Sequence, residues 1–477
     1  MNFNSFDYLC FLTLLYLFYR LYFGEKKSRR CYLLVASFIF YAWWSPIHVF
    51  LLLYSGFSDY YIAKYLHLNE DKKKRKIYLT LSISNNLLLL FTFKYLCAFI
   101  ENINIALEHT PMIFRIVNPE LILPIGISFY TFQTMSYAFD VYRKHIPPLE
   151  SKIDFLLYVS FFPQLVAGPI LRAKQFIPQL LGEFTFSKKM FFTGVFFIFY
   201  GLLKKNCIAD PLGVYFVDPV FLDPNSHTSY EILVSLYAYG FQVFNDFSGY
   251  SDIAIGSALL FGFSIPINFD SPFITTNPAD FWNRWHISLT HWVRDYVFYP
   301  FNSNKIFKGR IRLNMFVTMV IIGVWHGARW TYLFFGIFHG LLSILHSLYG
   351  KKLPSFKGKK AIIWKFFTWF CFWHFLCIGF LLFRADSMKH VWLITGAFVN
   401  NINLESKWDF PLMSSSITII LALLTHFIRA KKLENLGHHF ANLNNIVKII
   451  LCWIFFMIFM HYEYLHQGKQ AFIYFQF

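Results

Sequence analysis

The sequence predicts an all-α, polytopic membrane protein. Of its 477 residues, 56% are hydrophobic and only 14% are charged, whereas ordinary soluble domains carry about 25% charged residues. Many apolar runs approach the roughly 20 residues that an α-helix needs to cross a bilayer. The runs are continuous rather than alternating, which argues against a β-barrel. We expect about 11 membrane-spanning helices, with re-entrant segments around a central tunnel.

Residues 1–120 are expected to hold the first membrane-spanning helices. Their apolar runs lie at 8–23, 31–43, 48–66 and 77–100. Lys and Arg gather on the cytoplasmic side of short loops, so the basic clusters at 25–30 and 71–76 place the N-terminus outside. A cleavable signal peptide is not expected, because the basic residues follow the first apolar run instead of preceding it.

Residues 121–350 are expected to form the core. Long apolar runs lie at 121–140, 232–263, 313–326 and 331–349. Two further runs, 153–169 and 190–203, are short and contain prolines or glycines. Broken backbone survives at membrane depth only where protein buries it or water lines it. We therefore expect these two segments to re-enter the membrane rather than cross it, and to line a funnel.

Residues 351–477 are expected to form the last helices, at 361–383, 414–428 and 446–460, which leaves the C-terminus outside. Basic clusters at 305–312, 351–360 and 429–432, together with Lys204 and Lys205, are interpreted as cytoplasmic. The net charge of +17 then reflects membrane topology, and nucleic-acid binding is not expected. The seven cysteines form no CxxC pair, so we expect free thiols and no metal site.

His326 lies in the deepest apolar part of the core. It follows Arg310 and Arg312 by about 20 Å of helix, at the tip of a hairpin whose second helix covers 331–349. An ionisable group at membrane depth marks a functional site by default, and a neutral imidazole can take a proton from a hydroxyl nucleophile. A histidine that only packs in the bundle also fits this position. His339 and His346 are interpreted as structural.

A second group of polar residues lies at 279–296 and includes Asn283, Arg284, His286 and Arg294. The spacing is helical and places Trp282, Trp285, Leu289 and Trp292 on one apolar stripe. Asp280 precedes Arg284 by four residues, which favours an ion pair. Taken alone, the segment fits an interfacial amphipathic helix equally well.

Two carboxylates, Asp246 and Asp252, interrupt the apolar run at 232–263. No histidine or cysteine spacing nearby supports a metal site. A carboxylate at membrane depth needs a cation. We therefore expect this pair to face Arg284 or Arg294 across the tunnel.

Together these segments resemble the membrane-bound O-acyltransferase family, in its bacterial branch for alginate and peptidoglycan O-acetylation. The resemblance is carried by long motifs in one order, at 123–133, 140–143, 161–170, 246–254, 281–296, 323–327 and 338–340, and by the ending at 472–477. Several long motifs in a fixed order are more specific than any one of them.

The resemblance implies a helical bundle around a tunnel that a donor enters from the cytoplasm and an acceptor from outside. It assigns the catalytic role to His326 and a required role to His286. The residues expected to line the tunnel or contact substrate are Asn283, Arg284, Arg294, Asp246, Trp325 and Arg329. Arg329 departs from the family's pattern, in which a small or neutral residue is usual. A cation three positions from His326 would disfavour the imidazolium form.

The implied activity is transfer of acetyl groups across the bacterial cytoplasmic (inner) membrane, for O-acetylation of an alginate-like polysaccharide or peptidoglycan. Acetyl-CoA is the expected donor, and no bound cofactor is expected. The expected partners are an extracytoplasmic esterase-fold acetyltransferase, the envelope polysaccharide and membrane lipid. Two alternatives stay open. One is D-alanyl transfer from an acyl carrier protein, and the other is a transporter or flippase, for which inverted repeats would be typical.

Overall fold

In the computed structural model, the described part of the chain is built from helices and connecting segments. The structure describes residues 1–22, 26–108, 115–166, 168–183, 187–354, 356–403, 412–465 and 472–473. Within these ranges, five helices are long and apolar enough to cross a membrane: Lys72–Glu108, Lys188–Leu222, Trp330–Tyr349, Gly358–Arg384 and Asn445–Tyr462. The all-α, polytopic membrane fold is thereby confirmed. The number of spans, the tunnel and the sides of the termini stay predictions.

The chain divides into two compact units, Met1–Val195 with Ile253–Pro266, and Phe196–Asp252 with Ile267–Phe477. The first unit contains helices α1 to α9 and most of α10. Their bounds are α1 Phe6–Tyr22, α2 Lys26–Ala42, α3 His48–Leu68, α4 Lys72–Leu90, η1 Phe91–Tyr95, α5 Leu96–Glu108, α6 Ile127–Tyr142, α7 Lys152–Ser160, α8 Phe162–Leu165, α9 Ala173–Leu181 and α10 Lys188–Leu202. The three-part division drawn from the sequence stays a prediction.

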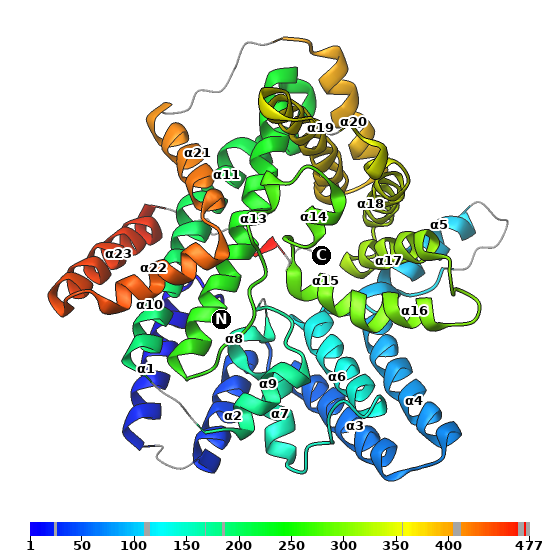
Figure 1. Ribbon diagram of the computed structural model, residues 1–477, viewed down its shortest axis with the longest axis vertical. Coiled ribbons are helices and arrows are strands. Elements are labelled where there is room, and N and C mark those ends of the chain that lie inside the picture. Colours follow the sequence, from blue (N-terminus) through cyan, green and yellow to red (C-terminus); the bar gives the residue numbers. More distant parts are fainter. Residues whose placement is uncertain are drawn as a thin grey trace. The chain divides into compact units, whose positions relative to one another are not determined.

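A buried polar network joins α3, α4 and α6, which lie side by side in Figure 1. Asp59 on α3 accepts hydrogen bonds from Ser82 (2.5 Å) and Asn86 (2.6 Å) on α4. The Thr134 hydroxyl on α6 donates to the side-chain amide oxygen of Asn86 at 2.9 Å. Polar side chains that satisfy one another hold helices together where water is absent. This network holds α3, α4 and α6 together in the first unit.

The two segments expected to be interrupted behave differently. The first is broken as predicted, because α7 ends at Ser160 and α8 begins at Phe162. The second prediction is wrong, since α10 continues through wide π turns to Leu222 as one 35-residue apolar helix. A π turn accommodates an extra residue without breaking the helix. Gly194 tightens packing rather than ending the helix, since a Cβ there would lie 2.7 Å from the Gly256 carbonyl oxygen.

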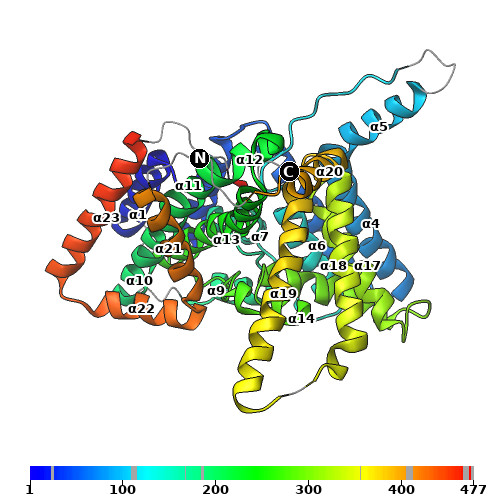
Figure 2. The same ribbon diagram turned by 90° about the horizontal axis from the view of Figure 1, so that it is seen from above.

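The second unit begins with the rest of that helix and contains most of α13. The bounds are η2 Leu203–Ala209, α11 Asp210–Leu212, η3 Gly213–Val217, α12 Asp218–Leu222, η4 Pro224–Ser226, α13 Ser229–Leu260, η5 Pro272–Ile274, α14 Pro278–Trp282, α15 Ile287–Val293, η6 Arg294–Phe298, α16 Tyr299–Ser303, α17 Ile311–His326, α18 Trp330–Tyr349, η7 Gly350–Lys352, α19 Gly358–Arg384, α20 Met388–Asn400, α21 Leu412–Phe427, α22 Ala430–Asn442 and α23 Asn445–Leu465. Helices α17, α18 and α19 lie side by side in Figure 2. The hairpin expected at 313–349 is confirmed.

The single helix expected over 279–296 does not form. Helix α14 ends at Trp282 and α15 begins at Ile287. The turn between them bonds to the preceding loop instead of to a helix: the Asp270 N–H donates to the Arg284 carbonyl, and the Ile287 N–H donates to the Asn268 carbonyl. These tertiary hydrogen bonds satisfy the backbone and override the helical spacing of the side chains.

The topology of α19 can be tested with single cysteines. Helix α19 has 27 residues, enough to cross a bilayer, and its basic start is expected on the cytoplasmic side. We expect Lys357→Cys to react with a membrane-impermeant maleimide only in opened vesicles. Ile402→Cys, at a position that is 82% exposed, should react in intact cells. Labelling of both positions from one side would contradict the predicted topology.

Candidate active site

His326 is the last residue of α17, and the close packing of α17 against α18 fixes where it lies. A Cβ at Gly323 would lie 2.8 Å from the Gly336 Cα on α18, and still closer to the Tyr332 carbonyl oxygen. Small residues let membrane helices approach in this way. The glycine contact lies less than one turn from His326 and therefore sets the position of the imidazole.

Replacing Gly323 with Val should disrupt this contact. The added side chain would meet the backbone of α18, and overpacking of this kind typically costs about 1–3 kcal/mol. We expect a lower melting temperature and a large loss of activity from displacement of His326. Gly396→Val on α20 is the matched control, because no described atom lies within 4 Å of a Cβ built there. Equal melting temperatures for the two variants would show that the contact does not position the hairpin.

The imidazole of His326 is buried among aromatic rings and is 6% exposed. Its ring centroid lies 4.9 Å from that of Trp325 and 4.8 Å from that of Phe383, both edge-on. Phe335 and Tyr332 lie slightly further away, at 6.0 and 6.3 Å. Edge-to-face packing holds a ring in a defined orientation. His326 is therefore a rigidly placed polar group in an otherwise apolar surrounding.

His286 also lies near Trp325. It is 1% exposed, and its ring centroid is 6.3 Å from that of Trp325 and 4.6 Å from that of Phe247. The turn that carries it lies outside the helices long enough to span a membrane. Burial lowers the pKa of His286 to about 3, so its imidazole is neutral at physiological pH.

The backbone of His286 adopts a left-handed conformation, with φ of 44°. A residue other than glycine in this region stores roughly 1–3 kcal/mol of strain, and such residues cluster at functional sites. The chain turns at this residue between α14 and α15, and the imidazole lies buried near the rings of Phe247 and Trp325. Two histidines forty positions apart in the sequence are thus brought near the same indole, that of Trp325.

His339 on α18, which we interpreted as structural, belongs to the same aromatic cluster. It is 3% exposed, and its ring centroid lies 4.5 Å from that of Phe335 and 5.3 Å from that of Trp282. Gly379 on α19 makes room for it, since a Cβ there would lie 2.7 Å from the His339 Nε2. A single sequence contains no signal that pairs these two positions.

The other residues expected to line the tunnel are dispersed. Asn283 is exposed. Arg284 forms the predicted ion pair with Asp280 at 2.8 Å. Arg294 pairs with Asp295 at 2.8 Å and lines a mainly apolar cavity of about 340 Å³.

Arg329, the residue that departs from the family's pattern, pairs with Asp386 at 2.9 Å, and its side chain is 41% exposed. The carboxylate offsets much of the charge that the guanidinium would otherwise present to His326. Arg329 should therefore disfavour the imidazolium form of His326 less than the sequence alone predicts.

Asp246 and Asp252 do not pair with Arg284 or Arg294, and this prediction is wrong. Asp246 pairs with Lys205 at 2.7 Å, and Asp252 pairs with Lys204 at 2.7 Å. Both lysines are buried, so they do not form an exposed basic cluster, and their placement on the cytoplasmic side stays a prediction. Carboxylates on the apolar helix α13 need cations at the same depth, and the π turn η2 supplies two adjacent ones.

The helical membrane fold encloses two histidines, His326 and His286, that both lie near Trp325, and a neutral imidazole in such a place can act as an acid or a base. The model of the MBOAT, membrane-bound O-acyltransferase, family matches residues 36–384. The chain belongs to this family and is an O-acyltransferase, which confirms the resemblance seen in the motifs.

Curated relatives agree with this assignment. The chain is 36% identical to the probable alginate O-acetylase AlgI of Pseudomonas aeruginosa over 375 residues, covering 78% of the chain and 70% of that protein. It is 31% identical to the peptidoglycan O-acetyltransferase of Helicobacter pylori over 386 residues, covering 76% of the chain and 72% of that protein. It is 33% identical to the teichoic acid D-alanyltransferase of Bacillus subtilis over 286 residues, covering 57% of the chain and 71% of that protein.

Proposed function

We propose that this O-acyltransferase moves acetyl groups across the bacterial cytoplasmic membrane to hydroxyl groups of an extracytoplasmic polysaccharide. The observation that carries the proposal is the meeting of His326, Trp325 and His286 at the end of α17. The other end of α17 begins beside the basic residues Arg310 and Arg312, which the positive-inside rule places toward the cytoplasm. Acetylating relatives also match more of the chain than the D-alanyltransferase does.

The chemistry assigned to His326 is that of a general base. The acceptor hydroxyl attacks the carbonyl carbon of an acetyl thioester as His326 takes its proton. A C–O bond forms, the C–S bond breaks, and the proton returns from the imidazole to the leaving thiolate. The neutral state of His286 suits a role in orienting the reacting groups rather than in attracting an anion.

Acetyl-CoA is the proposed donor, and no other cofactor is needed for this reaction. The mainly apolar cavity of about 340 Å³ lies along the part of α17 that precedes His326. Met319 and Ile322 line it together with Trp282. Apolar walls with a few polar groups are typical of sites for small ligands. The size and lining suit the flexible arm of a thioester, and Arg294 at the same cavity could meet a phosphate.

The acceptor side is proposed to work with a second protein. The family resemblance favours an extracytoplasmic acetyltransferase of esterase fold that receives the acetyl group and delivers it to the polymer. Deletion of this partner should abolish polymer acetylation and also stop turnover of the acetyl thioester by the membrane protein, because the acetyl group then has no acceptor.

The proposal is tested by mass analysis of envelope polymers from a deletion strain. We expect an acetyl group, 42 Da per modified sugar as the mass of acetyl replacing hydrogen, to disappear and to return on complementation. Loss of D-alanine instead would establish the alternative. Unchanged polymers under conditions where the wild-type gene is expressed would contradict both transfer reactions.

A further inference from the structure

Two residues of the C-terminal motif, Phe472 and Ile473, are buried in the second unit. Phe472 is 0% exposed and Ile473 is 5% exposed. They belong to the ending at 472–477, one of the motifs that carry the family resemblance. Apolar side chains so deeply buried are packed closely against their neighbours. The contacts that hold these two residues therefore indicate what the C-terminal motif does.

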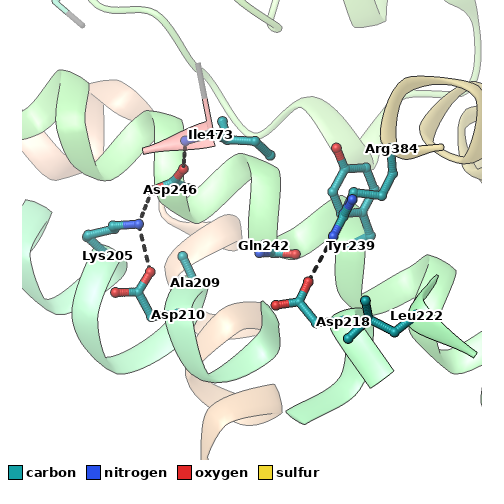
Figure 3. Close-up of a pocket in the computed structure, with 10 residues that line it drawn as sticks. All are labelled: Lys205, Ala209, Asp210, Asp218, Leu222, Tyr239, Gln242, Asp246, Arg384 and Ile473. Atoms are coloured by element: carbon teal, nitrogen blue, oxygen red, sulfur yellow. Dashed lines mark hydrogen bonds and ion pairs between the residues drawn. The ribbon is translucent and has the colours of Figure 1, made fainter. Parts of the chain in front are cut away.

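A carboxylate on α13 holds the backbone of this pair. The Ile473 N–H donates to Asp246 Oδ2 at 2.8 Å, a bond that Figure 3 shows. The other oxygen, Asp246 Oδ1, lies 2.7 Å from Lys205 Nζ. A hydrogen bond to a charged acceptor is stronger than one between neutral groups. Lys205 thus fixes the carboxylate that holds Ile473 in place.

The same lysine holds the C-terminal region at a second point. Lys205 Nζ lies 2.7 Å from Asp210 Oδ1, and the Tyr462 hydroxyl on α23 donates to Asp210 Oδ2 at 3.0 Å. Each of the two carboxylates therefore uses one oxygen for the lysine and the other for the C-terminal region. We call Lys205, Asp210 and Asp246 the lysine clamp. Removing either carboxylate would leave one C-terminal contact without its acceptor.

The ring of Phe472 connects the lysine clamp to the histidine site. It stacks on the ring of Tyr250, with centroids 4.1 Å apart, and its centroid lies 5.9 Å from that of Phe247. Phe247 in turn packs edge-on against the imidazole of His286 at 4.6 Å. Closely packed aromatic rings hold one another in defined orientations. Displacement of Phe472 would therefore loosen the packing that supports His286.

We propose that Phe472 and Ile473 are positioning residues for acyl transfer: the lysine clamp holds them, and they fix the imidazole of His286 through Phe247. The inference rests on the orienting role proposed for His286 and extends it to the C-terminal motif. A polar cavity of about 270 Å³ lies beside the clamp and is lined by Ile473. The C-terminal motif therefore forms part of the wall of that cavity.

The kinetics of Phe472→Ala test the proposal. Membranes from a deletion strain that expresses each variant are supplied with labelled acetyl-CoA, and the initial rate of label incorporation into polymer gives kcat and KM. The amount of the protein is measured by immunoblot. Displacement of an orienting group should lower kcat roughly tenfold and leave the KM for acetyl-CoA unchanged. Phe472→Leu keeps apolar volume but removes the stacked ring, and it should show the same fall in kcat.

The matched control is Phe459→Ala on α23, which also removes a buried ring from the C-terminal region. It should lower the melting temperature and leave kcat unchanged. The decisive comparison repeats Phe472→Ala in the His286→Gly chain, which keeps the left-handed turn without the imidazole. Residues that act through one group are not additive, so Phe472→Ala should cause no further loss there. A ring that only stabilises the fold predicts the same fold-loss in both chains.

Cysteine labelling tests the docking of the motif without any measurement of activity. The thiol of Ile473→Cys should react with N-ethylmaleimide much more slowly than that of Ile402→Cys, at a position that is 82% exposed. Mass spectrometry of the two peptides gives the extent of reaction. Adding Asp246→Ala should speed the reaction at position 473 roughly tenfold, because the acceptor of the backbone N–H is lost.

Three results would overturn the proposal. These are equal fold-losses from Phe472→Ala in the two chains, a fall in kcat for Phe459→Ala as large as that for Phe472→Ala, or equal labelling rates at positions 473 and 402. Failure of the proposed function has a different signature. Wild-type membranes that incorporate no acetyl group from acetyl-CoA would overturn the donor reaction, while the labelling rates would still decide whether the motif is docked.

Discussion

His326→Ala is expected to abolish polymer acetylation while the protein still reaches the membrane. The imidazole is the ionisable group at the end of α17, and removing a positioned general base typically lowers a rate by about 10²–10⁴-fold. The methyl group that replaces it leaves space among Trp325, Phe335 and Phe383 without a buried charge. The measurement is polymer-bound acetate by mass spectrometry, with the amount of membrane protein followed by immunoblot.

The control for this variant is His438→Ala on α22, a partly exposed histidine far along the chain from the cluster. It should leave acetylation unchanged. His326→Gln tests chemistry against packing, because its amide fills part of the space but cannot act as a base near neutral pH. Acetylation near the wild-type level in His326→Gln would show that His326 is not the general base.

His286 is expected to be nearly as important, and its left-handed backbone allows a sharp test. Asn and Gly both accept a left-handed conformation, so His286→Asn and His286→Gly keep the turn between α14 and α15. Both variants should lose at least roughly tenfold in acetylation if the imidazole orients the reacting groups. His286→Gly relieves the backbone strain of roughly 1–3 kcal/mol, so it should retain much of the thermal stability lost with the packed ring.

The comparison that decides the role of His286 is between activity and melting temperature. An imidazole that only packs predicts that activity follows stability across the Asn, Gly and Ala variants. An orienting imidazole predicts that all three lose activity while their melting temperatures differ. Full activity in a folded His286→Gly protein would contradict the orienting role.

The position of His326 was predictable because it depends on local counting. An apolar run of known length begins at basic residues, and a second run returns to basic residues, so the tip of the hairpin falls at Trp325, His326 and Gly327. The glycines of that hairpin carry the close contact between α17 and α18. Family motifs then supplied the expected role, which position alone left open between catalysis and packing.

The turn at His286 and the buried lysines were not predictable in the same way. Helical spacing at 279–296 described the buried face correctly, since Trp282, Trp285, Leu289 and Trp292 are all buried. The backbone instead follows tertiary hydrogen bonds to Asn268 and Asp270. The burial of Lys205 was not predictable because one of its carboxylate partners, Asp246, lies on another helix, although the other, Asp210, lies five residues further along the same helix. The sequence did contain one signal: Asp246 and Asp252 lie in an apolar segment, and buried carboxylates need cations nearby.

The central claim is that an acyl group reaches His326 from the cytoplasmic side and leaves on a hydroxyl from the other side. The most direct measurement uses the purified chain in proteoliposomes, with labelled acetyl-CoA supplied on the basic face and the expected partner acetyltransferase on the opposite face. We predict that label crosses to the opposite face with the wild-type chain and not with His326→Ala. Equal transfer by the two proteins would contradict the account.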